Sequence, residues 1–114
     1  MDEEEDTKLH MLRNAVLGVV RREESTHLTL RHLGVFLVCC ACEKPPTIGA
    51  LERTLGIQQS GITSALDALH SLDIVVRKRN PNNPCSNIAV LTEKGSLFID
   101  RLRQAMNEAQ VHTQ

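Results

Sequence analysis

From Thr47 to Leu91 the pattern of apolar and polar positions changes from helical spacing to alternation. Between residues 58 and 72, apolar side chains recur every three or four positions, which predicts an amphipathic helix. A shorter helix is predicted over residues 47–55, with Thr47 as its N-cap and Gly56 just past its end, where a left-handed conformation is needed. Residues 74–79 and 87–91 are predicted to be strands, joined by turn-forming residues 80–84.

Three further helices are predicted outside this stretch. The first covers residues 7–22, after a frayed acidic end at 1–6. The second follows an N-cap at Thr29, is apolar on nearly all sides and ends at Pro45 and Pro46, so it belongs in the middle of the fold. The last follows Thr92 and covers residues 93–110. The chain is therefore expected to be one domain, 1–114, mainly α with a small β wing, in which 47–91 form a winged helix-turn-helix.

The helix predicted over residues 58–72 carries small polar residues on its N-terminal turns. Free backbone N–H groups at a helix start favour phosphate oxygens, and side chains there can reach base edges in a major groove. A plain solvent-exposed face is the alternative, but the helix-turn-helix context favours DNA contact. The candidate residues are Gln58, Gln59, Ser60, Gly61, Thr63 and Ser64.

The first predicted strand of the wing ends in three cations, Arg77, Lys78 and Arg79. They could simply keep an edge strand soluble. We expect at least one of them to contact a phosphate, with Arg79 the best candidate because it lies closest to the wing loop. Duplex DNA is the partner that these residues predict.

These residues resemble the MarR-type winged-helix transcription regulators, small dimeric proteins that bind pseudo-palindromic operator DNA. The resemblance covers roughly residues 28–102. It rests on LTLRHLGVFL, LGIQQSGITSALDALHSLDIVVRKR, NP and LTEKG, in that order and at the familiar spacing. It implies that the helix over 58–72 enters the major groove.

The chain departs from the family pattern in four places. Ser64 stands where many members carry arginine, and Asp73 stands where glycine is common. Glu52 replaces a small residue in the first helix of the DNA-binding unit, so it must be paired, turned outwards or protonated. The wing lacks the acidic residues and the arginine of the family's loop, and this predicts weaker minor-groove contact. The aligned wing positions are Asn80, Pro81, Asn83 and Cys85.

The two terminal helices, expected within residues 7–27 and 93–110, carry apolar stripes. They could fold back on their own chain, but in the family the first and last helices of two subunits interlock, which implies a homodimer. The resemblance also implies a ligand cleft, and hence a small-molecule effector, although this chain is shorter than most members. The residues predicted at the dimer interface are Leu9, Leu12, Val16, Val19, Phe98, Leu102 and Met106.

Charge and composition limit the other classes of function. Of the 14 acidic residues five lie at positions 2–6, which leaves nine against 13 basic residues, a balance that permits DNA binding. The acidic start does not match a secretory signal, and the apolar run at 33–42 is about half the roughly 20 residues of a membrane span, so we expect a cytoplasmic protein with no membrane partner. Cys39, Cys40 and Cys42 are expected to fill the core as thiols, with no metal site.

The sequence shows no nucleophile with a base, no phosphate loop and no metal cage, so we expect neither an enzyme nor a cofactor. The prediction is a homodimeric, sequence-specific regulator of transcription, acting as a repressor on a pseudo-palindromic operator. Two alternatives stay open. The chain could be a DNA-binding protein of plasmid or phage replication or maintenance, or a winged helix that has lost DNA binding and binds proteins instead.

Overall fold

The computed structural model describes residues 3–21 and 28–112. The described residues form two compact units. One contains α1 (Glu3–Val20) and most of α5 (Glu93–His112), and the other comprises residues 28–96. The prediction of α1 was wrong at its start, because the helix begins at Glu3 and includes acidic residues that we expected to be frayed. The predicted extension of this helical segment to residue 27 lies outside the described residues.

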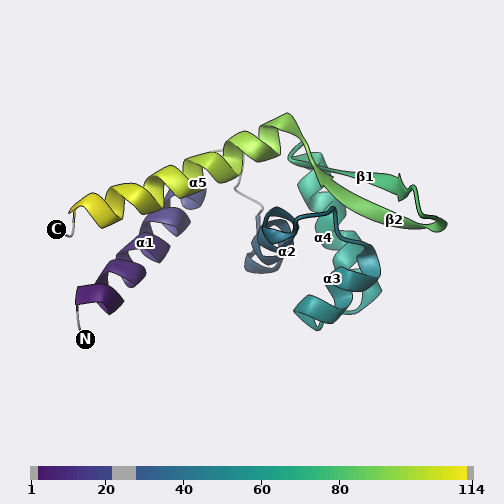
Figure 1. Cartoon of the computed structure of the whole chain (residues 1–114), viewed down its shortest axis with the longest axis horizontal. Helices are drawn as coiled ribbons and strands as arrows, with labels where there is room; N and C mark the ends of the chain where they lie inside the picture. Colours follow the sequence, from purple (N-terminus) through teal and green to yellow (C-terminus); the bar gives the residue numbers. More distant parts are fainter. Residues whose placement is uncertain (1–2, 22–27, 113–114) are drawn as a thin grey trace. The chain divides into compact units, whose positions relative to one another are not determined.

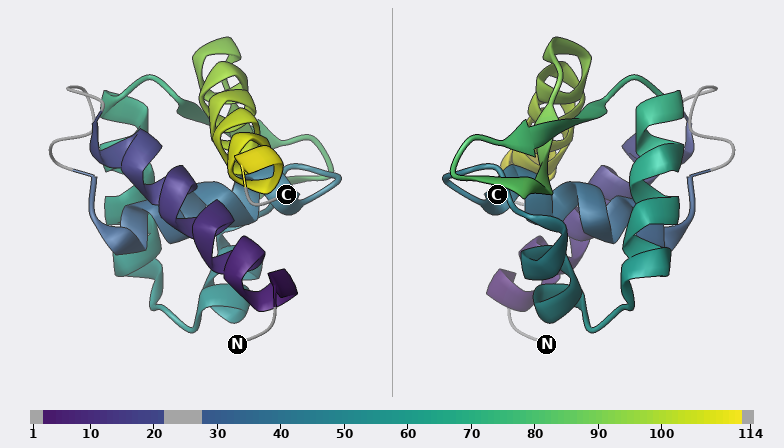
Figure 2. Two further views of the ribbon diagram at one scale, coloured as in Figure 1. Left: turned by 90° about the vertical axis from the view of Figure 1, so that its left-hand side faces the viewer. Right: turned by 90° about the vertical axis from the view of Figure 1, so that its right-hand side faces the viewer.

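The larger unit consists of three helices and a hairpin: α2 (Leu30–Ala41), α3 (Ile48–Leu55), α4 (Gln59–Ser71), β1 (Val75–Asn80) and β2 (Asn83–Leu91). Helix α4 contacts β1, while α2 and α3 contact β2, so the helices pack against one part of the hairpin and its tip projects away from them (Figures 1 and 2). The fold class is the predicted one, mainly α with a small β wing.

The sequence signals for helix ends are confirmed. The Thr29 and Thr47 side chains each accept a hydrogen bond from the third backbone N–H of their helix, and Thr29 forms a capping box with His32. Gly56 ends α3 with φ 67°, and Asp73 adopts φ 63° before β1. Both residues therefore hold the left-handed conformation that a side chain other than Asn or Asp rarely tolerates.

The core of the larger unit is formed by the apolar sides of α2, α3 and α4 together with the residues at the start of β1. Helix α2 was expected to be central, and its Val35 and Phe36 are fully buried, whereas Leu30 is 86% exposed and Leu37 is 41% exposed. One side of α2 therefore remains open within the single chain. The largest fully buried side chains are Phe36, Leu51, Ile62, Leu66, Leu69, Ile74, Val35 and Val75.

The hairpin differs from the prediction in its second strand. Strand β2 begins at Asn83 rather than residue 87, so the turn is only Pro81 and Asn82. The register shifts between Arg79 and Asn80, and the Asn80 side chain accepts a hydrogen bond from the Asn82 backbone N–H at 3.0 Å. This side-chain bond shapes the turn locally, which lets the ladder continue closer to the tip than the turn-forming composition suggested.

Candidate nucleic-acid interface

Helix α4 has one buried side and one exposed side. Ile62, Ala65, Leu66 and Leu69 are all fully buried, which fixes the helix rotation against α2 and α3. Its N-cap, Gln58, makes no side-chain capping hydrogen bond, in contrast to the threonine caps of α2 and α3. The first turn of α4 therefore lacks the side-chain acceptor that those two helices have.

The candidate contact residues on α4 lie where the sequence predicted them. Gln58, Gln59, Ser60 and Ser64 are exposed, and Gly61 and Thr63 are half-buried. They share the N-terminal turns of α4, on the side that the core leaves free. The arrangement presents amide and hydroxyl groups, which can donate to and accept from base edges and phosphates.

Among the described residues, one of the three wing cations forms an ion pair and the other two form none. Arg77 forms an ion pair with Asp67 on the exposed side of α4. Lys78 and Arg79 are exposed and lie nearer the tip, opposite Ile88 and Asn87 of β2. Arg77 is therefore partly neutralised, whereas Lys78 and Arg79 have no carboxylate partner in the part of the chain that the structure describes.

Sequence reasoning did not single out Asp67. The only available signal was an acidic residue on the polar side of the predicted helix, ten positions before a basic strand. Glu52, which we expected to be paired, turned outwards or protonated, is half-buried, and no described residue forms an ion pair with it. Helix α3 nevertheless packs closely against α4, because Leu51, the residue before Glu52, is fully buried.

The LTEKG segment joins the hairpin to α5 through closely packed backbone. The Thr92 hydroxyl donates to the Asp73 carbonyl at 2.6 Å and accepts from the Gly95 N–H at 3.0 Å. The Thr92 N–H donates to the Ile74 carbonyl at 3.2 Å. Gly95 is buried, and a Cβ there would lie 2.1 Å from the Ile74 carbonyl oxygen. Only glycine fits this contact without movement.

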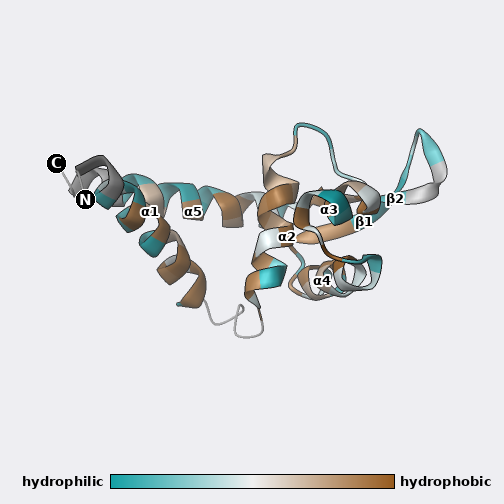
Figure 3. Ribbon diagram, turned by 90° about the horizontal axis from the view of Figure 1, so that it is seen from below, coloured by the Kyte–Doolittle hydropathy of each residue, from teal (hydrophilic) through white to brown (hydrophobic). Residues whose placement is uncertain are grey.

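The apolar residues predicted at a dimer interface fall into two groups. Val19, Phe98 and Leu102 are already buried in the single chain. Leu9, Leu12 and Val16, by contrast, are 52%, 60% and 42% exposed, and Figure 3 shows the apolar colouring along α1. Met106 is half-buried. The single chain therefore leaves a row of large apolar side chains on α1 in solvent.

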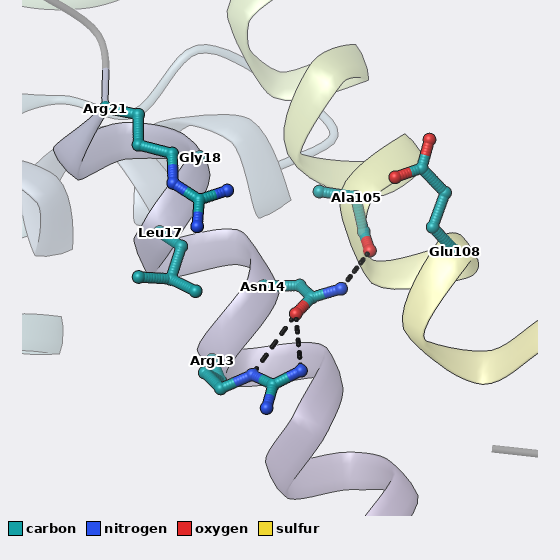
Figure 4. A pocket seen from close by; sticks show the side chains of 7 residues that line it. All are labelled: Arg13, Asn14, Leu17, Gly18, Arg21, Ala105 and Glu108. Atoms are coloured by element: carbon teal, nitrogen blue, oxygen red, sulfur yellow. Dashed lines mark hydrogen bonds between the residues drawn. The ribbon is translucent and has the colours of Figure 1, made fainter. Parts of the chain in front are cut away.

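Helices α1 and α5 enclose a hollow of about 430 Å³ in the smaller unit (Figure 4). The Asn14 amide nitrogen donates to the Ala105 carbonyl at 3.3 Å, and its oxygen accepts from the Arg13 guanidinium at 3.1 Å. Arg13, Asn14 and the Ala105 carbonyl are thus linked by hydrogen bonds along the wall of the hollow. Its lining residues are Arg13, Asn14, Leu17, Gly18, Arg21, Ala105 and Glu108.

The three cysteines of α2 and its C-cap are free thiols. Burial, followed by the neighbouring Cys40 and Cys42, raises the pKa of the Cys39 thiol from 9.0 to about 12. Cys39 is therefore the core residue that we expected. The same prediction was wrong for Cys42, which follows the end of α2 and is exposed, and Cys40 is half-buried. The side chain of Cys85, on the predicted wing, lies outside the described residues. Among the described residues there is no group of three potential metal ligands and no helix long and apolar enough to cross a membrane.

No protein-family model and no curated protein matches the sequence. Solved structures do match. A MarR-like transcriptional regulator from Thermotoga maritima is 22% identical with a TM-score of 0.72, over 98% of this chain and 80% of its own. A MarR-family regulator from Rhodococcus sp. RHA1 is 22% identical with a TM-score of 0.64, over 88% of this chain and 67% of its own.

A third match is the transcriptional repressor CouR bound to a 23-mer DNA duplex. It is 25% identical with a TM-score of 0.65, over 90% of this chain and 69% of its own. CouR from Rhodococcus jostii RHA1 has also been solved with p-coumaroyl-CoA, and this chain spans 66% of that protein. The chain thus spans about two thirds of the length of several of these regulators.

Proposed function

We propose that this chain, which has the winged-helix fold of the MarR-type transcriptional regulators, binds duplex DNA and regulates transcription through α4. The observation that carries the proposal is the division of α4 into a fully buried apolar side and an exposed polar N-terminal end. A helix held in this way can enter a major groove without unfolding its own core. The DNA complex of CouR, a neighbour of the same fold, supports the choice of ligand.

Contacts on α4 and on the wing are expected to serve different purposes. Gln59 and Thr63 lie on the first turns of α4, where amide and hydroxyl groups can distinguish base pairs. Ser60 and Ser64 are exposed on the same turns. Lys78 and Arg79 offer unneutralised charge that attracts phosphates whatever the sequence. The protein therefore reads DNA with α4 and holds its backbone with the wing.

The test is a binding assay after selection of preferred sites from a random DNA pool. Thr63→Ala and Gln59→Ala should change sequence preference, whereas Arg79→Ala should weaken binding about equally on all sequences. Arg103→Ala removes a charge from an exposed residue of α5 and serves as the control. Unchanged binding in all three α4 and wing variants would rule out this mode of docking.

We further propose a homodimer that docks its two copies of α4 on half-sites about one DNA turn apart, ~34 Å. The exposed apolar row of Leu9, Leu12 and Val16 supports a second copy as its cover, because single domains rarely leave such rows in water. Sedimentation should show a wild-type dimer, a weakened dimer for Leu12→Asp, and an intact dimer for the control Leu30→Asp in the other unit. A monomeric wild type would overturn this step.

Repression is the mode of regulation that we propose, because a dimer seated on a promoter blocks access to it. A small-molecule effector is proposed as the signal that releases the DNA. The p-coumaroyl-CoA complex of CouR supports an effector in this fold. In a reporter assay, deletion of the gene should raise transcription from the selected operator, and a fall would indicate activation instead.

One observation favours a second candidate, a winged helix that binds protein. Arg77 is held by Asp67, so the wing has less free charge than its sequence suggests. Gel shifts at ~50 and ~200 mM salt separate the candidates, because DNA binding weakens steeply with salt. Binding that weakens with salt supports the regulator, and no binding at either concentration supports the protein-binding module.

A further inference from the structure

Arg31, near the start of α2, lies beside the first turn of α4 although 27 positions separate it from Gln58 in the chain. Both residues line one hollow of about 290 Å³, together with the turn that ends α3. Sequence reasoning did not select Arg31, because nothing in the spacing of residues indicates that the starts of α2 and α4 meet. The hollow is lined by Arg31, Gly56, Ile57, Gln58, Ser60 and Gly61.

The approach of Arg31 to α4 depends on a missing side chain. A Cβ at Gly61 would lie 3.4 Å from the Arg31 guanidinium nitrogen Nη1 and 2.6 Å from Ile57 Cγ2. Glycine at position 61 therefore leaves room for the guanidinium over the first turn of α4. The Arg31 side chain therefore lines the same hollow as the exposed side chains of Gln58 and Ser60.

Arg31 also differs from the wing arginine nearest to the middle of α4. Arg77 forms an ion pair with Asp67, whereas Arg31 is exposed and no carboxylate among the described residues pairs with it. An exposed guanidinium in a concave surface suits a phosphate oxygen, because its planar donors match the oxygens of that group. Its place beside α4 means that the phosphate would belong to the strand next to the groove that α4 enters.

We propose that Arg31 binds a backbone phosphate of the duplex and sets the depth and angle at which α4 docks. This proposal rests on the proposed function, since it assumes that α4 enters DNA. It extends the proposed DNA-contacting surface from α4 and the wing to the start of α2. Arg31 carries no sequence information itself and acts by positioning α4.

The experiment measures DNA affinity of the full chain as a function of salt for wild type, Arg31→Gln, Arg31→Lys and Arg103→Gln, on the selected operator and on random duplex. Loss of one phosphate contact should reduce the slope of log K against log salt by about 0.9, or about 1.8 for a dimer with two such contacts. Arg31→Gln should show this reduction on both DNAs, while Arg31→Lys should largely retain the wild-type slope. Arg103→Gln makes the same charge change at an exposed residue of the other unit, which does not line the hollow, and should leave the slope unchanged.

The outcomes distinguish failure of the role of Arg31 from failure of the proposed DNA binding. If wild type and Arg31→Gln both bind DNA with the same slope of log K against log salt, the role of Arg31 is overturned and the proposed function stands. Wild type that binds no DNA would overturn both. A reduced slope in Arg103→Gln equal to that of Arg31→Gln would also refute the proposal, because the effect would then be one of net charge.

Discussion

Gly95→Ala tests how tightly the hairpin and α5 are joined. An added methyl carbon would lie 2.1 Å from the Ile74 carbonyl oxygen and 3.1 Å from its carbon, whereas real Cβ contacts essentially never fall below 3.0 Å. The first turn of α5 and the residue before β1 must therefore separate. The Ile74 carbonyl also accepts the Thr92 N–H, so the movement weakens that hydrogen bond as well.

The expected cost follows from these contacts. Overpacking of this kind costs about 1–3 kcal/mol, and a weakened hydrogen bond adds about 1 kcal/mol. Alanine recovers up to about 1 kcal/mol within a helix relative to glycine, because it loses less backbone freedom on folding. The net expectation is a loss of about 1–3 kcal/mol in the free energy of unfolding.

Urea denaturation followed by circular dichroism measures this loss, at one fixed protein concentration because association shifts apparent stability. Gly34→Ala in α2 is the matched control. A Cβ there would meet only Leu55 Cδ2 at 3.8 Å, an ordinary contact, so this variant should be as stable as wild type or more stable. The reasoning would be refuted if Gly95→Ala were as stable as Gly34→Ala.

Three further predictions concern other parts of the larger unit. Thr47→Ala removes the acceptor of the Ala50 N–H and should lower the free energy of unfolding by about 1 kcal/mol. The control Thr54→Ala, at an exposed position of the same helix, should change it by less than about 0.5 kcal/mol. Equal effects of the two substitutions would contradict the capping role of Thr47. In the folded protein the exposed Cys42 should react with a thiol reagent at about pH 8 well before Cys39 does, as mass spectrometry of the labelled protein would show. Rapid labelling of Cys39 in the folded state would refute its burial. Because folding raises the pKa of Cys39 from 9.0 to about 12, the contribution of its neutral thiol to the free energy of unfolding is complete below pH 9.0 and is lost as the pH rises towards 12. Arg77→Ala should cost at most about 1 kcal/mol in a urea titration, since the ion pair is solvent-exposed, and a larger loss would mean that the pair holds the wing in place.

Local signals in the sequence determined most of the helices and their ends. Thr29 and Thr47 begin helices because their hydroxyls accept backbone N–H groups only a few residues away. Gly56 and Asp73 end segments because their backbones tolerate positive φ. The buried side of α4 follows from residue spacing alone. These features depend on neighbours within one or two turns, which is why the order of elements and the exposed residues of α4 could be predicted.

The tertiary structure decided what distant residues do to one another. Whether Arg77 is free or held by Asp67, and whether Arg31 reaches α4, depends on how a strand and two helices pack, and residue spacing does not encode that. The same holds for Gly95, whose necessity comes from the Ile74 carbonyl across a packed junction. The sequence indicated which residues are candidates for the proposed DNA-binding surface, and packing determined which of their charges are paired within the chain.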